Sequence, residues 1–500
     1  MEAGAPVTGT LRPVGVVGVG VAAPSLRLAQ SEVAQAWSAG GGRAQVAVCD
    51  GDEDTLTLAW QAARRALDAA GVESAAVSGL WWGTTRPPFA EGPSHAFLAG
   101  ALDLPSDVEG CLCAGSPHAG MEALVSAWDA LAAGHAEVAL VVASDALVPG
   151  IGTGGEVATG AGAGAVVLVA LPGDSNGAGP PAQLVSRISR TMAVVDRTRG
   201  DDDPGTGDVY DPRLFREGVY LPMVAAAGEA LGTQERWSVS DPDGKLAAAA
   251  AKRLGGTLVS AAAQGAVGDA GAAAALLGAG EALGAAGSLG VVGYGGGRVT
   301  ALSVDVRRPV PGADGVGEAL SGGQAVGYVG ALKARRQLRP QTDPIPMGVP
   351  PGGAAFVRGN AEMLALQGAR CAACGTVSTP PSIHPHCINC GGTDLEVVRL
   401  ARRGRVQTFV VNQTMPPPFQ APLPLVVLDL DDGARLMVQG ISADAGDLAV
   451  GDEMTLVLRR YALERGIPIY GYKAVRVGGA SGTAGAAGSA AAGAETAPTR

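Results

Sequence analysis

Four of the seven cysteines in this 500-residue chain form two CxxC pairs, the pattern in the sequence with the most specific chemistry. Each CxxC turn places two thiolates on one side of a tight loop, and the glycine that follows each pair lets the backbone curl around the sulfurs. Two such turns complete a tetrahedral four-sulfur shell with no open position. We therefore predict a structural Zn²⁺ held by Cys371, Cys374, Cys387 and Cys390, with an iron centre or metal-free thiols as the alternatives. The two histidines between the pairs are expected to be loop residues.

Composition and charge exclude several classes of protein. The chain is 47% hydrophobic and 17% charged, which is typical of a well-buried globular protein. A net charge of -11 disfavours non-specific binding to nucleic acid or to anionic membranes. No apolar run approaches the roughly 20 residues of a membrane span, and the N-terminus lacks the basic and apolar regions of a secretory signal. With thiols read as metal ligands, we expect a cytoplasmic protein without nucleic-acid or membrane partners.

Short apolar strands alternate with alanine-rich helices over the first 306 residues, and the order of elements is similar in two successive rounds. This alternation favours a layered α/β domain and is compatible with a duplicated unit. The first round is predicted at 13–23, 52–70, 79–83, 119–133, 137–143 and 164–171, and the second at 245–254, 258–261, 270–284, 288–293 and 299–306.

The C-terminal third has a different pattern. A Pro- and Gly-rich stretch leads to a helix at about 359–367 and then to the cysteine pairs. Five short strand-like runs follow between residues 405 and 477, which fits a small OB-type barrel. We predict an α/β domain at 1–337, a linker at 338–357, a helix and zinc ribbon at 358–400, an OB-fold barrel at 401–477 and a disordered tail at 478–500.

Five segments, in the same order along the chain, resemble archaeal and bacterial 3-hydroxy-3-methylglutaryl-CoA synthases. They are DEDTLTLAWQAARRALDAAGV, GTTRPPFAEGPSHAFLAGAL, SPHAGMEAL, DPDGKLAAAAAKRLG and VGDAGAAAALLGAG, within residues 13–335. The resemblance implies a thiolase-like αβαβα domain that forms a homodimer and acts on an acyl-CoA or acyl-carrier substrate. Residues 358–477 resemble the zinc-ribbon/OB-fold proteins that partner thiolases and these synthases, which implies CoA binding and a possible thiolase-type partner enzyme.

The residues that this family needs for chemistry are replaced here. The resemblance implies a cysteine that carries an acetyl group, a glutamate that acts as general acid and base, and a histidine and an asparagine that position the second acyl-CoA. Aligned on the segments above, these positions hold Pro117, Thr85, Ser240 and Asp269. Proline has neither a nucleophile nor an N–H, so the ordinary covalent mechanism cannot run at Pro117.

Several nearby residues are candidates to take over that chemistry. Cys113 paired with His118 or His95 could act as nucleophile and base if its loop folds back; Cys111 is a second thiol. The alternative is that both thiols are small buried hydrophobes, because a nucleophile four residues before the helix loses its dipole assistance. Asp269 and Ser240 could form a polar pair that positions substrate or removes a proton, or an ordinary helix cap.

Other residues are candidates for substrate binding. By analogy with the family, the Gly-rich turn that contains Gly295 and Gly296 would let the backbone approach the acyl group, and Thr85, His95 and Pro117 would line the same site. Arg197 and Arg213 could bind CoA phosphates or could be solvated surface residues.

Three functions remain compatible with these residues. The first is an acyltransferase that forms C–C bonds on acyl-CoA without the standard catalytic set. The second is a catalytically silent acyl-CoA-binding scaffold that partners an active thiolase-type enzyme. The third is C–C cleavage or aldol-type chemistry without a covalent acyl-enzyme.

Overall fold

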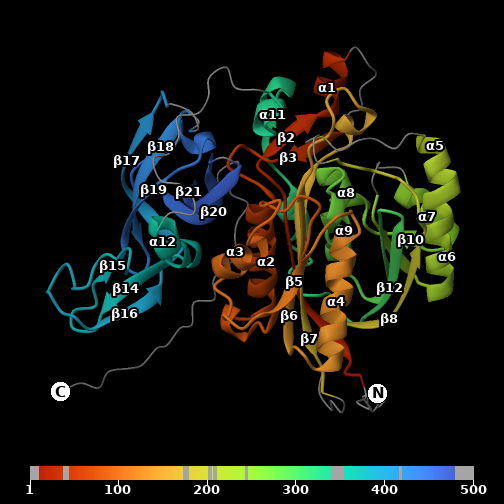
Figure 1. Cartoon of the computed structure of the whole chain (residues 1–500), viewed down its shortest axis with the longest axis horizontal. Coiled ribbons are helices and arrows are strands. Elements are labelled where there is room, and N and C mark those ends of the chain that lie inside the picture. The colour runs from red at the N-terminus through yellow and green to blue at the C-terminus, as the bar shows by residue number, and fades with distance from the viewer. Residues whose placement is uncertain are drawn as a thin grey trace, which may run out of the picture.

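The structure is a computed structural model that describes residues 11–37, 44–172, 179–200, 205, 211–241, 246–338, 354–415, 419, 421–464 and 466–478. An α/β unit makes up most of the molecule, and a ribbon and a barrel lie beside it, next to α2 and α3 (Figure 1). No helix within these ranges is both long and apolar enough to cross a membrane.

A ten-stranded sheet organises the α/β unit, in the order β10-β9-β11-β12-β8-β1-β7-β6-β4-β5. Its two halves repeat one topology. In each half, three parallel strands (β5-β4-β6 and β10-β9-β11) are followed by two antiparallel ones (β7-β1 and β12-β8). The halves join where β1 pairs with β8. The predicted duplication of an α/β unit is thereby confirmed.

The first half supplies one round of elements. It comprises β1 (Val14–Ala22), α2 (Thr55–Ala70), η1 (Ser74–Ala76), β4 (Gly79–Gly83), α3 (Ser94–Ala101), β5 (Glu109–Cys113), α4 (Ala119–Ala133), β6 (Val138–Ala146), η2 (Gly154–Val157) and β7 (Ala161–Ala170). The element predicted at 52–70 is α2, which begins three residues later at Thr55, because the Asp54 carboxylate caps it by accepting hydrogen bonds from the backbone N–H groups of Leu56 and Thr57. It ends at Gly71, whose φ of 64° favours glycine.

The second half repeats the round with shorter helices. It comprises β8 (Ala182–Thr191), α5 (Pro212–Leu214), the π-helical η3 (Phe215–Tyr220), α6 (Leu221–Leu231), β9 (Arg236–Val239), α7 (Leu246–Leu254), β10 (Thr257–Leu258), α8 (Ala261–Val267), η4 (Gly271–Ala273), α9 (Ala274–Ala282), β11 (Gly287–Gly295) and β12 (Arg298–Val306). A small parallel and antiparallel sheet, β13-β2-β3, lies beside it with three short helices. These elements are β2 (Leu26–Ala29), α1 (Gln30–Ala36), β3 (Gln45–Val48), α10 (Val316–Leu320), β13 (Gln324–Val326) and α11 (Tyr328–Ala334).

Five layers follow from how the helices pack. Helix α2 contacts the outer face of the first half at β1, β6 and β7, whereas α6 contacts β8 and β12 and packs against α7 on the other side. Helices α4 and α9 contact each other and strands of both halves, so they form the middle layer. The αβαβα arrangement predicted from sequence is confirmed. It buries large side chains such as Trp82 and Trp237 completely or almost so.

The C-terminal part builds the predicted ribbon and barrel. Its elements are α12 (Ala354–Ala365), β14 (Gln367–Cys371), β15 (Val377–Ser378), β16 (Leu395–Arg399), β17 (Arg403–Asn412), β18 (Leu423–Leu430), β19 (Arg435–Gln439), η5 (Ser442–Asp444), β20 (Glu453–Glu464) and β21 (Ile467–Arg476). The ribbon sheet runs β15-β14-β16 and the barrel sheet runs β19-β18-β17-β20-β21. A bridge from Gly440 to Ala474 brings the two edges of the barrel together.

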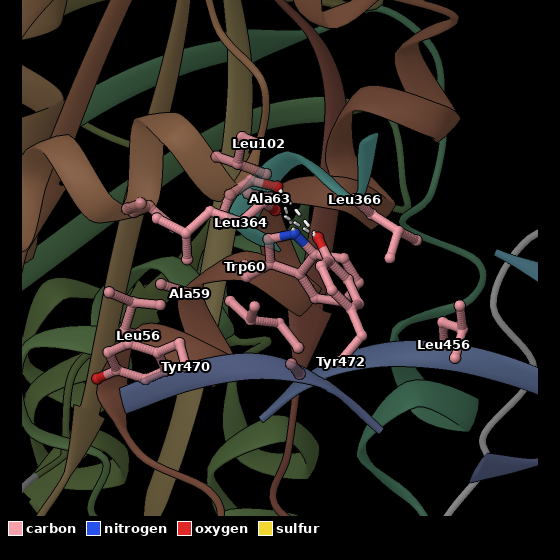
Figure 2. Packing of buried hydrophobic residues seen from close by; sticks show 14 of the residues in the cluster. Leu56, Ala59, Trp60, Ala63, Leu102, Leu364, Leu366, Leu456, Tyr470 and Tyr472 are labelled. Atoms are coloured by element: carbon pink, nitrogen blue, oxygen red, sulfur yellow. Dashed lines mark hydrogen bonds between the residues drawn. The ribbon is translucent and has the colours of Figure 1, made fainter. Parts of the chain in front are cut away.

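The barrel packs on α2 and α3 through aromatic side chains (Figure 2). The rings of Trp60 and Tyr472 meet edge to face with centroids 5.7 Å apart. The Tyr472 hydroxyl donates to the Leu364 carbonyl at 2.8 Å, and the Trp60 indole donates to the Ala101 carbonyl at 3.0 Å. One apolar cluster therefore runs from the α/β unit through α12 into the barrel.

Three predictions of local structure differ from what the structure shows. The strand predicted at 258–261 is only β10, because α8 begins at Ala261. The helix predicted at about 359–367 begins at Ala354. Cys111 and Cys113 lie in β5, where sequence suggested a loop, because β5 pairs in parallel with β4. Most of the predicted linker and nearly all of the predicted tail lie outside the described residues.

Candidate active site and metal ribbon

The four positions that the sequence prediction aligned with the family's catalytic residues each follow or precede a helix or strand. Thr85 follows β4, Pro117 precedes α4, Ser240 follows β9, and Asp269 follows α8. Strands β4 and β6 run parallel in the first half and β9 and β11 in the second, so within each half the carboxyl ends lie at one edge of that half's sheet. Ligands of α/β sheets usually bind outside the carboxyl ends of the strands.

Asp145, at the end of β6, links Thr85 to the segment that carries Asp269. Its carboxylate accepts hydrogen bonds from the Thr84 hydroxyl at 2.9 Å, from the Thr85 N–H at 2.8 Å and from the Thr85 hydroxyl at 2.9 Å. A fourth bond comes from the Ala272 N–H at 2.7 Å. Burial raises the pKa of Asp145, and the four donors oppose that rise. Sequence reasoning missed this residue, although its place at the end of a buried apolar strand was a usable signal.

Asp269 pairs with Arg197. One carboxylate oxygen forms an ion pair with the Arg197 guanidinium, and the other accepts from the Gly271 N–H at 2.9 Å. Asp269 is 7% exposed. The neighbouring Arg199 reaches the Thr85 carbonyl at 3.5 Å. The segment with both arginines therefore connects the Thr85 position to the Asp269 position.

Ser240 and Pro117 are connected through the end of β11. The Ser240 hydroxyl accepts from the Tyr294 N–H at 3.0 Å. The next residue, Gly295, lies so close to the start of α4 that a Cβ atom there would stand 2.5 Å from the His118 nitrogen and 2.8 Å from the Pro117 Cβ. Gly296 has a φ of 58°, as the tight turn between β11 and β12 requires. The glycines thus bring the β11 end against α4.

Ser240 and Asp269 are held by different partners, so they do not form the polar pair that the sequence suggested. The carboxylate that caps α7 is Asp241, which accepts from the N–H groups of Leu246 and Ala247. The start of α7 is thus capped by the residue after Ser240, whereas Asp269 accepts from the Gly271 N–H at the start of η4, which is compatible with the helix-cap alternative.

The histidines make hydrogen bonds to other groups than Cys113. His118 is buried, its Nε2 lies 2.9 Å from the Thr300 hydroxyl, and its Nδ1 lies 3.4 Å from Glu122. His95 Nε2 bonds the Leu80 carbonyl at 2.9 Å. The polar neighbour of the Cys113 sulfur is Cys111, 3.9 Å away.

Burial raises the pKa of the Cys113 thiol to about 12, which disfavours a thiolate. The structure does not bring Cys113 into a hydrogen bond with either histidine.

Arg213 and Arg197 are placed very differently. Arg213 is exposed in the short helix α5, whereas Arg197 points to Asp269. Of the two predicted phosphate ligands, Arg213 has the solvent-exposed side chain.

The four cysteines of the two CxxC pairs converge at one end of the ribbon. All four sulfurs lie within 4.8 Å of one another. Cys371 and Cys390 are 3.6 Å apart, and Cys374 and Cys387 are 3.5 Å apart. Sulfurs at tetrahedral corners around Zn²⁺, with bonds of about 2.3 Å, would be separated by about 3.8 Å. The donor set and its spacing fit a four-thiolate metal site.

Two cavities lined by described residues border the C-terminal part. One, of about 500 Å³, is mainly apolar and lies between α12, the ribbon and the barrel, with Leu366, Leu436, Tyr461 and Ile469 in its wall. The other, of about 280 Å³, lies between the α/β unit and the barrel.

The comparisons with known proteins divide along the same two parts. Residues 397–459 match the family described as ChsH2, C-terminal OB-fold domain. A DUF35 domain-containing scaffold protein of Methanocaldococcus jannaschii is 34% identical over 117 residues, which is 22% of this chain and 82% of that protein. The hydroxymethylglutaryl-CoA synthase of Pyrococcus furiosus is 30% identical over 159 residues, or 32% of this chain. The match spans 45% of that enzyme, less than half its length.

The solved structures agree on the fold. The structure of MvaS in complex with 3-hydroxy-3-methylglutaryl coenzyme A is 20% identical, with a TM-score of 0.56, and the match covers 67% of this chain and 95% of that one. At this identity the likeness is one of fold. The protein is thus a hydroxymethylglutaryl-CoA synthase-like domain of thiolase fold joined to a four-cysteine ribbon and OB-fold part that belongs to the DUF35 family.

Proposed function

We propose that the protein binds a thioester-linked acyl group, on CoA or an acyl carrier, and forms a C–C bond on it. One observation carries the proposal. Thr85, Pro117, Ser240 and Asp269 come from distant parts of the sequence, yet Asp145 links Thr85 to the segment of Asp269, and the end of β11 links Ser240 to Pro117. The two pairs meet where the start of α4 packs against Ala272, since a Cβ on Gly120 would stand 2.2 Å from the Ala272 carbonyl oxygen. The likeness to hydroxymethylglutaryl-CoA synthases supports the substrate class.

The residues present favour a route without a covalent acyl-enzyme at Pro117. In this proposal the Asp269 carboxylate takes a proton from the carbon next to the thioester carbonyl. The resulting enolate attacks the carbonyl carbon of the second substrate, and the new alkoxide takes up a proton. Arg197, already beside Asp269, would hold the enolate oxygen. No group leaves and no electrons are exchanged with a cofactor.

The test is product analysis with acetyl-CoA and a panel of ketoacyl-CoAs and aldehydes, read by mass spectrometry. We expect a β-hydroxyacyl product, an unchanged protein mass, and a loss of at least about 100-fold in rate for Asp269→Asn. Asp305→Asn is the matched control, because Asp305 is exposed and paired with Arg307. Absence of product from every pair of substrates would reject the enzyme proposal.

A second candidate is a silent scaffold that binds acyl-CoA for a partner enzyme. Two points support it: the resemblance aligns Pro117 with the family's nucleophile, and the matching DUF35 relative is named a scaffold protein. The apolar cavity beside α12 would then be a place for the acyl chain. Saturable acyl-CoA binding without turnover would support this function.

Pro117→Cys tests the site under either function. A thiol at the start of α4 would gain the helix dipole and adjacent amides. We expect acetyl-CoA to acylate this variant at residue 117 and to leave the wild-type protein unmodified.

We further propose structural Zn²⁺, a homodimer and a cytoplasmic location. The sulfur geometry supports the zinc. The edge position of β5, with Cys111 exposed, supports pairing with a second copy. Thiols free of disulfides support a reducing compartment.

A further inference from the structure

The cavity of about 280 Å³ between the α/β unit and the barrel gathers more cations than anions. Segments far apart in sequence line it: β3 and the start of α2, the loop after β4, the end of β6, the end of α11, and the β20–β21 hairpin. Among the described residues in its wall, the charged groups are Arg86, Arg335, Arg336, Arg460, Glu53 and Asp54. The remainder of the wall is mainly apolar, including Pro87, Leu147 and Val148.

Both carboxylates in the wall are already engaged. Glu53 accepts from the Ser25 N–H and hydroxyl at 2.9 Å and pairs with Arg459 at 3.2 Å. Asp54 caps α2, accepts from the Tyr470 hydroxyl at 2.7 Å and faces Arg460 at 3.4 Å. They therefore have little capacity left to neutralise the other arginines.

Arg335 and Arg336 lack carboxylate partners within the described chain. Arg335 donates from Nη2 to the Thr159 carbonyl at 2.9 Å, but its Nη1 is buried with no hydrogen-bond partner. Burial lowers the pKa of Arg335 to about 10, and the charge of Glu156 opposes that fall. Arg336 lies beside it in the wall, with its side chain exposed and without a hydrogen bond to a described residue. A buried guanidinium donor without an acceptor is costly.

We propose that this cavity binds a small dianionic oxyanion, such as a phosphate group or a short dicarboxylate. Arg335 and Arg336, which have no carboxylate partner among the described residues, leave room for two negative charges, and a guanidinium fork matches the oxygens of either group. The volume corresponds to about nine waters at roughly 30 Å³ each, enough for such an anion with a short carbon body. The anion would contact the α/β unit and the barrel at once, so its binding would stabilise their docking.

The experiment is thermal unfolding of the full-length protein in the absence of acyl-CoA. Inorganic phosphate and succinate are titrated separately at constant ionic strength against chloride. We expect a saturable rise in the midpoint with at least one of them, and an apparent affinity about tenfold weaker or worse in Arg335→Met. Arg435→Gln is the control, because Arg435 pairs with Asp429 on the exposed side of the barrel and should leave the affinity unchanged.

A response to phosphate alone assigns the site to phosphate groups, and a response to succinate alone assigns it to dicarboxylates. If Arg335→Met does not fold, Arg336→Gln gives the same comparison, because the Arg336 side chain is exposed. The proposal is overturned if neither anion acts beyond chloride, or if the folded arginine variants bind as tightly as wild type. Since no acyl substrate is present, that failure would leave the proposed C–C bond formation untouched.

Discussion

Two buried carboxylates, Asp54 and Asp145, are held in contrasting ways. Asp54 lies where the barrel packs on α2, and its oxygens meet two backbone N–H groups, the Tyr470 hydroxyl and the Arg460 guanidinium. Asp145 lies at the candidate active site and meets two threonine hydroxyls and two backbone N–H groups. Among the described residues, no ion pair involves Asp145.

The difference indicates that Asp54 holds the two parts of the molecule together, whereas Asp145 is held ready for a role at the candidate active site. At the docking interface a negative charge is matched by a positive one, so both parts gain by staying together. At the active site neutral donors hold a carboxyl group whose pKa is raised by burial. Such uncompensated groups cost stability and are more common where function requires them.

The largest loss of stability is expected from removing the metal. This experiment tests whether the docking of the barrel on α2 depends on a folded ribbon. Structural zinc in small four-thiolate sites contributes on the order of 10 kcal/mol to the folding of its own domain. A strong chelator, or Cys387→Ser, should therefore unfold β14–β16. The docking contacts of β20 and β21 involve none of the four cysteines, so the barrel should stay bound to α2.

The measurement is zinc content per chain together with hydrogen exchange by segment. Loss of protection should be confined to residues 367–399. Cys111→Ser is the matched control, because this thiol lies in β5 and should change neither quantity. Full-length protein with no bound metal and a protected ribbon would contradict the zinc assignment.

Asp54→Ala should have the next largest effect. It removes the α2 cap, at about 1 kcal/mol, and leaves Arg460 and the Tyr470 hydroxyl without their acceptor in a buried interface. We expect a loss of about 3 kcal/mol in the free energy of unfolding, measured by urea denaturation. Asp68→Ala, which breaks an exposed pair with Arg64 on the same helix, should cost less than about 1 kcal/mol. Equal losses in both variants would argue against a special role of the interface.

The fold was largely predictable because its signals are local. Apolar runs such as β4 and β6 cannot be exposed, and Asp54 and Gly71 mark the ends of α2 by their own hydrogen bonds and φ. The four-cysteine site was equally predictable from local sequence, since each CxxC turn fixes the positions of two sulfurs. Strand β5 was not predicted, because it is short and half exposed and therefore lacks an apolar pattern of its own. It becomes a strand only by pairing with β4.

The candidate site was only partly predictable. The resemblance pointed to Thr85, Pro117, Ser240 and Asp269 as site positions, but it could not show which residues these four side chains contact. That Arg197 pairs with Asp269, and that His118 bonds Thr300, depends on how segments more than 70 residues apart meet. The role of the acidic run before α2 could not be predicted, because its basic partners in β20 and β21 lie about 400 residues away.

Asp145→Asn tests the active-site half of the comparison. An amide can accept at one oxygen only, so its NH2 group would face a donor, either Thr85 or Ala272. We expect a loss of about 2 kcal/mol in the free energy of unfolding and a fall in any acyl-CoA turnover.

The loss caused by Asp145→Asn should depend on pH. The folded pKa of Asp145 lies above the ordinary carboxyl value of about 3.9. The stability that this carboxyl contributes is therefore fully present below about pH 4 and declines as pH rises through its folded pKa. Urea denaturation from acid to neutral pH should show the gap between wild type and variant narrowing. A gap that widens with pH would mean that Asp145 is stabilised as an anion.

The smallest effect concerns Asp50, at the start of the acidic run that leads to Asp54. Burial and the nearby charge of Asp52 raise the pKa of Asp50 to about 6, so this carboxylate, unlike Asp54, is poorly compensated. The sign is the same as for Asp145: its favourable contribution is complete below about pH 4 and is lost as pH rises through about 6. Asp50→Asn keeps an acceptor for the Gly51 N–H and removes the charge, so it should stabilise the protein by roughly 1 kcal/mol at pH 8, after allowance for solvent screening. The gain should vanish near pH 4. If Asp50→Asn were less stable than wild type at pH 8, the basic groups of β20 and β21 would compensate the charge of Asp50 as well as that of Asp54. The contrast between a compensated and an uncompensated carboxylate would then hold only for Asp54 and Asp145.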